Sequence, residues 1–241
     1  AYEMLRSLVG SEMCIRDRPL VGRKEELTTL RLLLDKAIAG QGGLVLIGGE
    51  AGLGKTRLVR ELRAHGYKRQ VRFLKGDCYE GNRSAYQPFI DILREYSSRS
   101  QEFDSLIIEG AEAELIKLVP ELASRTLVGD INPSIAVEVE SEEYQLFTAL
   151  FHLLRRVSRN KPILIFLDNL QWVDERSASL LYYLANNLGK EHILICGAYR
   201  SEEIEEGHIL DKLIKKLEEE KIATLIQLKP LPVSEATEMV G

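Results

Sequence analysis

Apolar residues recur along the chain in two patterns, one typical of helices and the other of buried strands. The leucines of residues 24–39 repeat every three or four positions, which predicts an amphipathic helix. Unbroken apolar runs, such as residues 162–167, favour strands buried on both faces. The pattern predicts strands over 44–48, 71–75, 162–167, 192–198 and 222–228. It predicts helices over 24–39, 56–63, 87–97, 141–159, 180–188 and 209–220.

Strands alternate with helices along most of the chain, which indicates an α/β domain with a parallel, doubly wound sheet. A long stretch separates the second predicted strand from the third, and its residues 101–145 carry 11 acids against 2 bases. Within it, the polar residues 97–100 are expected to end one helix, and short helices are expected around Pro120. We therefore predict an acidic helical insertion at about 87–159.

Residues 49–56 match the phosphate-binding template G-x-x-x-x-G-K-[S/T]. They read Gly49-Glu50-Ala51-Gly52-Leu53-Gly54-Lys55-Thr56. A predicted strand precedes them and a predicted helix follows, which is the context that the motif requires. Glycines let successive N–H groups point inward at an anion, and the following helix presents its positive dipole end to that anion. Lys55 adds a positive charge, and the Thr56 hydroxyl can bind Mg²⁺.

A second motif is the apolar run that begins at Pro162 and ends in the carboxylate of Asp168. In parallel sheets, ligands bind at the carboxyl ends of the strands. An aspartate at that position can hold the water shell of Mg²⁺. Taken alone, such an aspartate is more often structural, but together with the phosphate-binding motif it predicts a nucleotide site.

Composition narrows the class of protein. The chain has 241 residues, 45% hydrophobic and 29% charged, with a net charge of −5, which is typical of one globular domain. No apolar run approaches the roughly 20 residues of a membrane span, so no membrane partner is expected. The three cysteines have no metal-binding spacing, and we expect a cytoplasmic location. Residues 55–75 carry eight Lys or Arg against Glu61 alone, which we interpret as a solvated helix face and loop rather than a basic partner surface.

Four segments, taken together, resemble the AAA-type ATPase module of STAND proteins, the signal-transduction ATPases with numerous domains. They are Pro19–Leu27, the phosphate loop at 49–56, Asp168–Asp174 and Gly197–Arg200. The resemblance covers residues 19 to about 241. It implies a P-loop NTPase fold with five parallel strands in the order 5-1-4-3-2, and it implies ATP or ADP with Mg²⁺ as ligands.

Residues near the two ends of the sequence suggest the limits of the domain. Residues 7–18 resemble translated sequencing-adapter read-through, so we expect residues 1–18 to be an artefactual or disordered leader. Residues 19–230 are expected to form the nucleotide-binding domain. A helix start at Ser234 follows Pro230-Leu231-Pro232, so residues 231–241 are expected to begin a truncated helical lid domain.

Matching positions imply roles for individual residues. The residues implied to hold the phosphates are Gly49, Ala51, Gly52, Leu53, Gly54, Lys55 and Thr56. Thr56 and Asp168 would bind the metal ion. Gly22 and Arg23 correspond to the segment beside adenine and ribose, although Arg23 could equally be an exposed charge at a helix N-terminus. Arg57 could reach a phosphate or be a surface cation, and the second interpretation is favoured.

Residues after the third and fourth predicted strands also match the family. Arg200 corresponds to the position that senses the γ-phosphate, and the alternative is a salt bridge with Glu202 or Glu203. Asp174 matches a Trp-x-Asp element but is also placed to cap the next helix, which we favour. Trp172 is interpreted as a packing anchor.

One departure from the family concerns the residue after Asp168. Many relatives carry a second carboxylate there, whereas this chain has Asn169. An amide can donate a hydrogen bond to a water but cannot accept its proton. Phosphoryl transfer depends mainly on positioning and charge stabilisation, so hydrolysis need not be lost. Without a carboxylate at this position it is expected to be slow. The catalytic candidates are Lys55, Asp168, Asn169 and Arg200.

Two classes of function fit these residues. The first is a slow, nucleotide-gated switch in a multidomain signalling or transcription-regulating protein, which would act on downstream effector domains of the same chain and could form an ATP-dependent homo-oligomer. The alternative is an origin-recognition-like, DNA-associated AAA ATPase, because such proteins share the Val21-Gly22-Arg23 start. Nucleic acid would then be contacted only by domains beyond residue 241. A metabolic kinase is a third class, but no acceptor site supports it.

Overall fold

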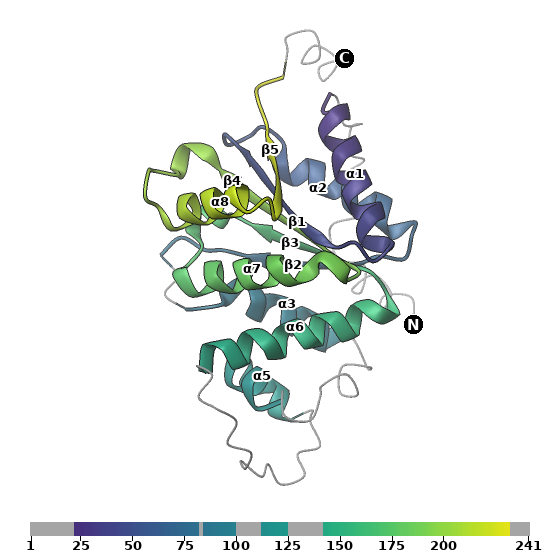
Figure 1. The fold of residues 1–241 in the computed structure, drawn as a ribbon, viewed down its shortest axis with the longest axis vertical. Coiled ribbons are helices and arrows are strands. Elements are labelled where there is room, and N and C mark those ends of the chain that lie inside the picture. The colour runs from purple at the N-terminus through teal and green to yellow at the C-terminus, as the bar shows by residue number, and fades with distance from the viewer. Residues whose placement is uncertain (1–21, 82–83, 100–111, 125–141, 232–241) are drawn as a thin grey trace, which may run out of the picture.

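The computed structural model describes residues 22–81, 84–99, 112–124 and 142–231 (Figure 1). Its strands are β1 Gly43–Gly49, β2 Arg72–Asp77, β3 Ile163–Asp168, β4 Ile193–Arg200 and β5 Ala223–Gln227. Its α-helices are α1 Lys24–Ile38, α2 Lys55–Tyr67, α3 Gln87–Arg99, α5 Glu112–Leu118, α6 Glu142–Asn160, α7 Glu175–Asn187 and α8 Ile209–Glu219. Short 3₁₀ helices are η1 Pro120–Ser124, η2 Leu170–Trp172, η3 Leu188–Lys190 and η4 Ser201–Glu203. Every predicted strand is present.

The five strands form one sheet in the order β2-β3-β4-β1-β5. All four neighbouring pairs are parallel. Parallel neighbours need a crossover between them, which the intervening helices supply. Read from the opposite edge, this order is 5-1-4-3-2, so the prediction of an α/β, doubly wound P-loop NTPase fold with this strand order is confirmed.

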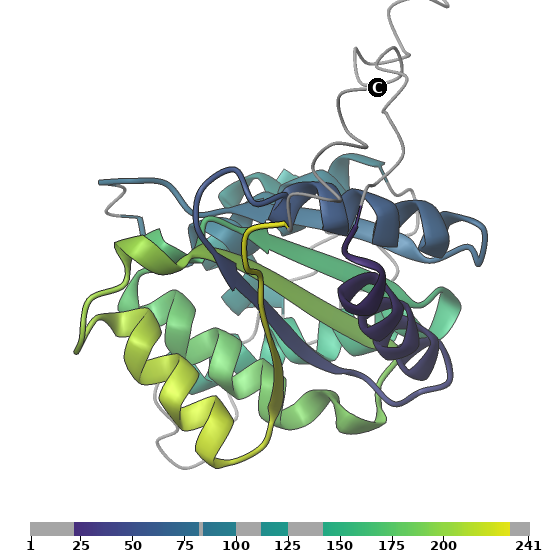
Figure 2. The ribbon, with the colours of Figure 1, turned by 90° about the horizontal axis from the view of Figure 1, so that it is seen from above.

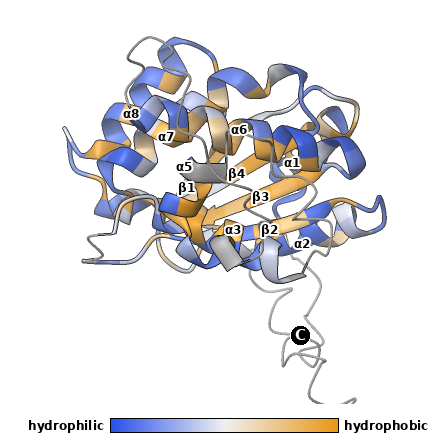
Figure 3. Ribbon diagram, turned by 90° about the horizontal axis from the view of Figure 1, so that it is seen from below, coloured by the Kyte–Doolittle hydropathy of each residue, from blue (hydrophilic) through white to orange (hydrophobic). Residues whose placement is uncertain are grey.

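Helices cover both faces of the sheet (Figure 2). On one face, buried leucines of α1 and α2 pack against alternate residues of β1, β3 and β4. On the other face, α3, α6, α7 and α8 contribute to a larger cluster that also includes residues of α5. The strands are therefore apolar on both sides, whereas the helices turn polar residues outward (Figure 3).

The acidic segment between β2 and β3 contains α5 and η1 among its described residues, which confirms short helices around Pro120. The helices α3 and α6, at the two ends of the predicted insertion, pack into the same core as α7. The predicted leader at 1–18, and all of the predicted lid at 231–241 except its first residue, lie outside the described residues. Those domain limits remain predictions.

Several element ends differ from the sequence-based prediction: α2 continues to Tyr67 instead of residue 63, and β2 continues to Asp77 instead of residue 75. Two further ends, those of α3 and β4, differ as well. The helix expected to stop at residue 97 continues to Arg99, and its serine hydroxyls bond within the helix instead of ending it. The Ser97 hydroxyl donates to the Arg94 carbonyl at 3.1 Å, and the Ser98 hydroxyl donates to the Glu95 carbonyl at 2.9 Å. The strand expected to end at residue 198 continues to Arg200, which brings that side chain to the carboxyl edge of the sheet.

Within the described part of the chain, no helix is both long enough and apolar enough to cross a bilayer. No group of three or more His, Cys, Asp or Glu side chains is arranged there to hold a metal ion. Cys78 and Cys196 are free and buried. Burial raises the pKa of Cys78 to about 12, so that thiol is protonated and unreactive at neutral pH.

Candidate functional site

The carboxyl edge of the sheet collects the predicted site residues on one face. Gly49 at the end of β1 lies beside Arg200 at the end of β4, and Asp168 at the end of β3 lies beside Asp77 at the end of β2. Phe166 and Ala198, which lie two positions before Asp168 and Arg200, pack in the same cluster as α1 and α2. Because side chains alternate along a strand, both point to the face on which the phosphate loop leads into α2.

The phosphate loop has the backbone that its glycines predict. Gly52 and Gly54 have φ angles of 80° and 91°, in the left-handed region that side-chain-bearing residues rarely adopt. A Cβ atom placed at either residue would meet nothing within 4 Å. The loop therefore borders open space, and α2 begins directly after it.

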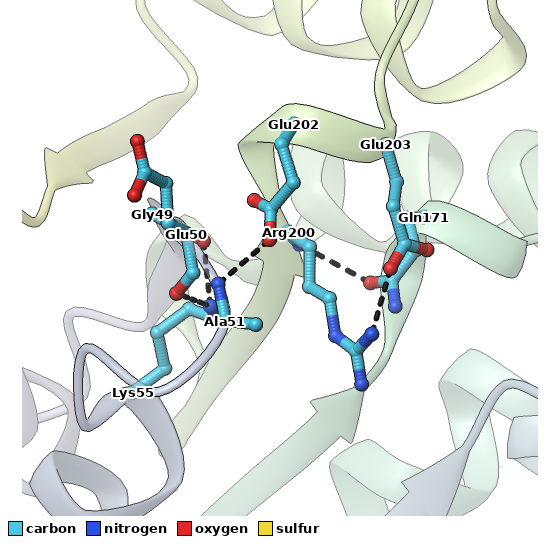
Figure 4. Close-up of polar contacts among 8 residues, drawn as sticks. All are labelled: Gly49, Glu50, Ala51, Lys55, Gln171, Arg200, Glu202 and Glu203. Carbon is cyan, nitrogen blue, oxygen red and sulfur yellow. Dashed lines mark hydrogen bonds and ion pairs between the residues drawn. The ribbon is translucent and has the colours of Figure 1, made fainter.

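The ammonium group of Lys55 lies across the loop. Its Nζ donates to the Gly49 carbonyl at 2.6 Å and to the Glu50 carbonyl at 2.8 Å (Figure 4). Burial lowers the pKa of Lys55, and the carboxylate of Glu202 opposes this shift more than any other charge. The positive charge thus lies where the motif predicts an anion.

Glu202, in η4, is a site residue that the sequence analysis considered only as a partner for Arg200. Its Oε1 atom accepts a hydrogen bond from the Ala51 N–H at 2.7 Å (Figure 4). The pKa of Glu202 is lowered by its own N–H and then by that of Ala51. A carboxylate is thus bound at this amide, and the donors of the loop fit an anionic ligand.

Asp168 is the last residue of β3, and Asn169 follows it at the edge of the sheet. Burial raises the pKa of Asp168, and Lys75 opposes that shift. The Asn169 N–H donates to Asp168 Oδ1 at 3.0 Å, and Asn169 has a left-handed φ of 56°. Asp77, which the sequence analysis did not single out, pairs with Lys75 at 2.7 Å. Its place directly after the second predicted strand, behind Gly76, was the signal that could have indicated it.

Arg200 is held by neighbours in the same region. Its Nη1 atom pairs with Glu203 Oε1 at 2.7 Å, and its N–H donates to Gln171 Oε1 at 3.2 Å (Figure 4). Its guanidinium lies 5.6 Å from the Trp172 ring centre. Of the two proposed salt bridges, the structure contains the one to Glu203. Trp172 packs against the core, as predicted, and the γ-phosphate-sensing role of Arg200 remains a prediction.

The structure contradicts one of the two interpretations of Arg23, that of an exposed charge at a helix N-terminus. Its side chain is only 8% exposed and pairs with Glu26 at 3.2 Å. Its Nη2 atom also donates to the carbonyl of Lys229 at 2.5 Å. The guanidinium is therefore not an exposed helix charge, because it ties the start of α1 to the segment after β5. The preceding Gly22 has a φ of 69°, and a contact of this segment with adenine remains a prediction.

The remaining predicted residues lie near the N-termini of two helices. Thr56 is exposed on the first turn of α2. Arg57 pairs with Glu61 at 3.1 Å, which fits the interpretation as a surface cation. Asp174 Oδ1 accepts from the Ser177 N–H at 2.9 Å and caps α7, which confirms capping as its structural role.

A separate cavity lies between α6, α7 and α8, on the other face of the sheet. It has a volume of about 560 Å³, and its walls include Tyr144, Phe147, Tyr182 and Tyr183. None of the predicted site residues lines it. The candidate site is therefore the open edge beside the phosphate loop rather than this apolar cavity.

Three solved structures are similar to this chain at low sequence identity. The first is a Walker-type ATPase of Pyrococcus abyssi, 18% identical with a TM-score of 0.48, and the match covers 92% of this chain and 57% of that one. The second is a STAND protein with a tetratricopeptide repeat sensor from Pyrococcus horikoshii, 20% identical with a TM-score of 0.47, and the match covers 93% of this chain and 25% of that one. The third is a DNA replication initiation factor, 15% identical with a TM-score of 0.47, and the match covers 92% of this chain and 51% of that one. At these scores the likenesses are too distant to inform function.

A curated relative comes from Rhizobium meliloti (strain 1021), where it is described as an uncharacterized protein. It is 27% identical over 233 residues, which cover 88% of this chain and 22% of the relative. This chain thus spans about a fifth of that protein's length. Residues 19–196 match the AAA ATPase domain family. Because this match covers most of the chain and includes both the phosphate loop and Asp168, the chain belongs to the AAA ATPase domain family.

Proposed function

We propose that this domain binds ATP with Mg²⁺, hydrolyses it slowly and acts as a nucleotide-gated switch in a larger regulatory protein. The observation that carries the proposal is the anion contact of the phosphate loop, in which the Ala51 N–H binds a carboxylate beside the Lys55 ammonium. Backbone amides, a helix N-terminus and a fixed positive charge together favour a phosphate chain.

Each part of the site has a role in this proposal. The backbone N–H groups from Ala51 to Gly54 and the Lys55 ammonium would bind the phosphates. The Thr56 hydroxyl and the Asp168 carboxylate would hold the metal ion. A bound Mg²⁺ would neutralise charge that develops on the phosphate oxygens.

Slow turnover is supported by two residues at the edge of the sheet. Asn169 cannot accept the proton of an attacking water. Arg200 is paired with Glu203 at 2.7 Å, so a terminal phosphate must compete with that carboxylate for the guanidinium. A ligand whose contacts differ between two arrangements can shift the balance between them. This competition supports a switch, whose output would reach effector domains or neighbouring subunits.

The direct test is Lys55→Ala, measured by calorimetry with ATP and Mg²⁺. We expect binding to be lost, because no other cation lies against the Gly49 and Glu50 carbonyls in the described structure, while circular dichroism shows an unchanged fold. The matched control is Lys68→Ala, which removes an exposed lysine at the far end of α2. Equal affinity in the Lys55 variant and the control would show that the loop is not the nucleotide site.

Turnover tests the second part of the proposal. The wild-type chain should release phosphate from ATP well below about once per second, at the slow end of the usual range for enzymes. Rapid steady-state release would contradict a slow switch while leaving nucleotide binding in place.

A further inference from the structure

The short helix η4 places two carboxylates against the two groups that the proposed function reserves for phosphates. Glu202 Oε1 accepts from the Ala51 N–H of the phosphate loop at 2.7 Å. Glu203 Oε1 pairs with the guanidinium of Arg200 at 2.7 Å. Figure 4 shows both contacts side by side at the edge of the sheet. Neither glutamate belongs to the phosphate-binding motif, and the two are adjacent in the sequence.

A carboxylate and a phosphate oxygen compete directly for one donor. Both are anionic acceptors that make short, strong hydrogen bonds to N–H groups. The Ala51 N–H points at Glu202 at a distance that leaves no room for a second acceptor along the same line. Glu202 is also the charge that most strongly opposes the burial effect on the pKa of Lys55. The anion site of the loop is thus filled from within the chain.

We propose that Glu202 is an internal competitor for the phosphate site, so that nucleotide binds by displacing its carboxylate from the Ala51 amide. Glu203 is displaced from Arg200 in the same way when a terminal phosphate arrives. The proposal rests on the proposed function, and it adds the residue that sets the threshold for binding. Ligands with several charged oxygens, such as di- and triphosphates, overcome this competition more readily than a single phosphate ion.

The position of Glu202 allows this exchange. Its side chain is exposed, and η4 is only three residues long. Exposed charge contacts contribute little to stability. A released carboxylate can therefore move into water at small cost. The pKa of Glu202 is lowered by its own N–H and by that of Ala51, so the competitor is charged at neutral pH.

The same helix is connected to the last strand of the sheet. Gln227 Nε2, at the end of β5, donates to the Ser201 hydroxyl of η4 at 2.9 Å. The backbone carbonyl of Lys229, just beyond β5, accepts a hydrogen bond from the Arg23 guanidinium. If release of the Glu202 carboxylate shifts η4, the contact between Ser201 and Gln227 at the end of β5 changes with it. This is a physical route from the phosphate site to the carboxyl end of β5.

The test compares Glu202→Ala with Glu205→Ala by calorimetry. Both variants remove one exposed negative charge from the same stretch, but Glu202 is the one that contacts the loop amide. We expect the dissociation constant for ATP with Mg²⁺ to fall by roughly three- to tenfold in Glu202→Ala, the value of an exposed charge-assisted hydrogen bond. It should stay within about twofold of wild type in Glu205→Ala. Pyrophosphate should gain by the same factor, because it needs no base contact.

A second measurement separates this inference from the proposed function. Without any nucleotide, the Ala51 amide resonance should shift in Glu202→Ala and not in Glu205→Ala, because a hydrogen bond to that amide is lost. If the wild type binds ATP and the two variants bind it equally well, the competitor is overturned and the proposed function stands. If none of the three binds ATP or pyrophosphate, the proposed function and the competitor both fail, even where the Ala51 resonance reports the contact.

Discussion

At the scale of single residues, Asn169 combines a backbone requirement with a chemical limit. Its φ of 56° lies in the left-handed region, which asparagine and aspartate tolerate better than most residues with side chains. Its amide oxygen cannot take a proton from water. Of the two residues that would supply a carboxylate here, aspartate tolerates this left-handed backbone, whereas glutamate tolerates it less well.

The first residue-scale prediction follows from this difference. Asn169→Asp should raise the rate of ATP hydrolysis by about tenfold or more, the low end of what a positioned general base contributes, with little change in affinity for ATP. Asn169→Ala is the control and should not raise the rate. Steady-state phosphate release by the purified domain measures both. A rate unchanged in Asn169→Asp would indicate that positioning, rather than proton transfer, limits turnover.

Residue roles were predictable where the partner is close in the sequence and not where it is distant. Asp174 was expected to cap the next helix, and it bonds to a residue three positions on. Arg23 was assigned either to a nucleotide or to solvent, yet it contacts the carbonyl of Lys229. Spacing along the chain says nothing of a contact across 206 positions, because only the closing of the fold brings those two residues together.

At the scale of elements, α7 shows how a local signal starts a helix. Asp174 has an extended backbone and its side chain accepts from the Ser177 N–H. The Ser177 hydroxyl also donates to the second carboxylate oxygen. The capping aspartate therefore satisfies a donor that the first turn of the helix leaves open.

The element-scale prediction concerns this cap. Asp174→Ala should lower the free energy of unfolding by about 1 kcal/mol, the usual cost of removing an N-cap. Asp174→Asn should lose much less, because the amide oxygen can accept the same bond. Urea denaturation of both variants measures the difference. Equal losses in the two variants would show that charge, and not capping, is the contribution of Asp174.

Helix ends were less predictable than helix positions. The serines after Tyr96 suggested a break, but their hydroxyls bond to the preceding turn and α3 continues. Serine competes for backbone groups in either arrangement, so its presence does not decide the end of a helix. What decides is packing: Phe89, Ile92 and Tyr96 are buried against the core and hold the helix in place through its last turn.

At the scale of the whole molecule, the spacing between the layers depends on contacts between backbones. A Cβ atom at Gly76 of β2 would lie 2.2 Å from the Pro88 carbonyl oxygen at the start of α3. No such contact exists at Gly43 of β1, where a Cβ would meet nothing within 4 Å. The close packing of β2 against α3 therefore requires glycine at position 76, whereas the packing around β1 does not require it at position 43.

The prediction at this scale pairs those glycines. Gly76→Ala should lower the free energy of unfolding by about 1–3 kcal/mol, because α3 or β2 must move to admit the methyl group. Gly43→Ala should be neutral or stabilising by up to about 1 kcal/mol, since it reduces the freedom of the unfolded chain. Chemical denaturation of the two variants tests this. A Gly76 variant as stable as the Gly43 variant would mean that α3 does not rest on β2 as described.

The sequence by itself determined the elements, the parallel sheet and the phosphate loop. Those features depend on periodicity, on glycine spacing and on residues adjacent in the chain, all of which a linear pattern records. Only the tertiary structure decided that Glu202 lies on the Ala51 amide and that Arg23 reaches Lys229. Such contacts join segments 151 and 206 residues apart, and their geometry depends on how the crossover helices place the strand ends at one edge.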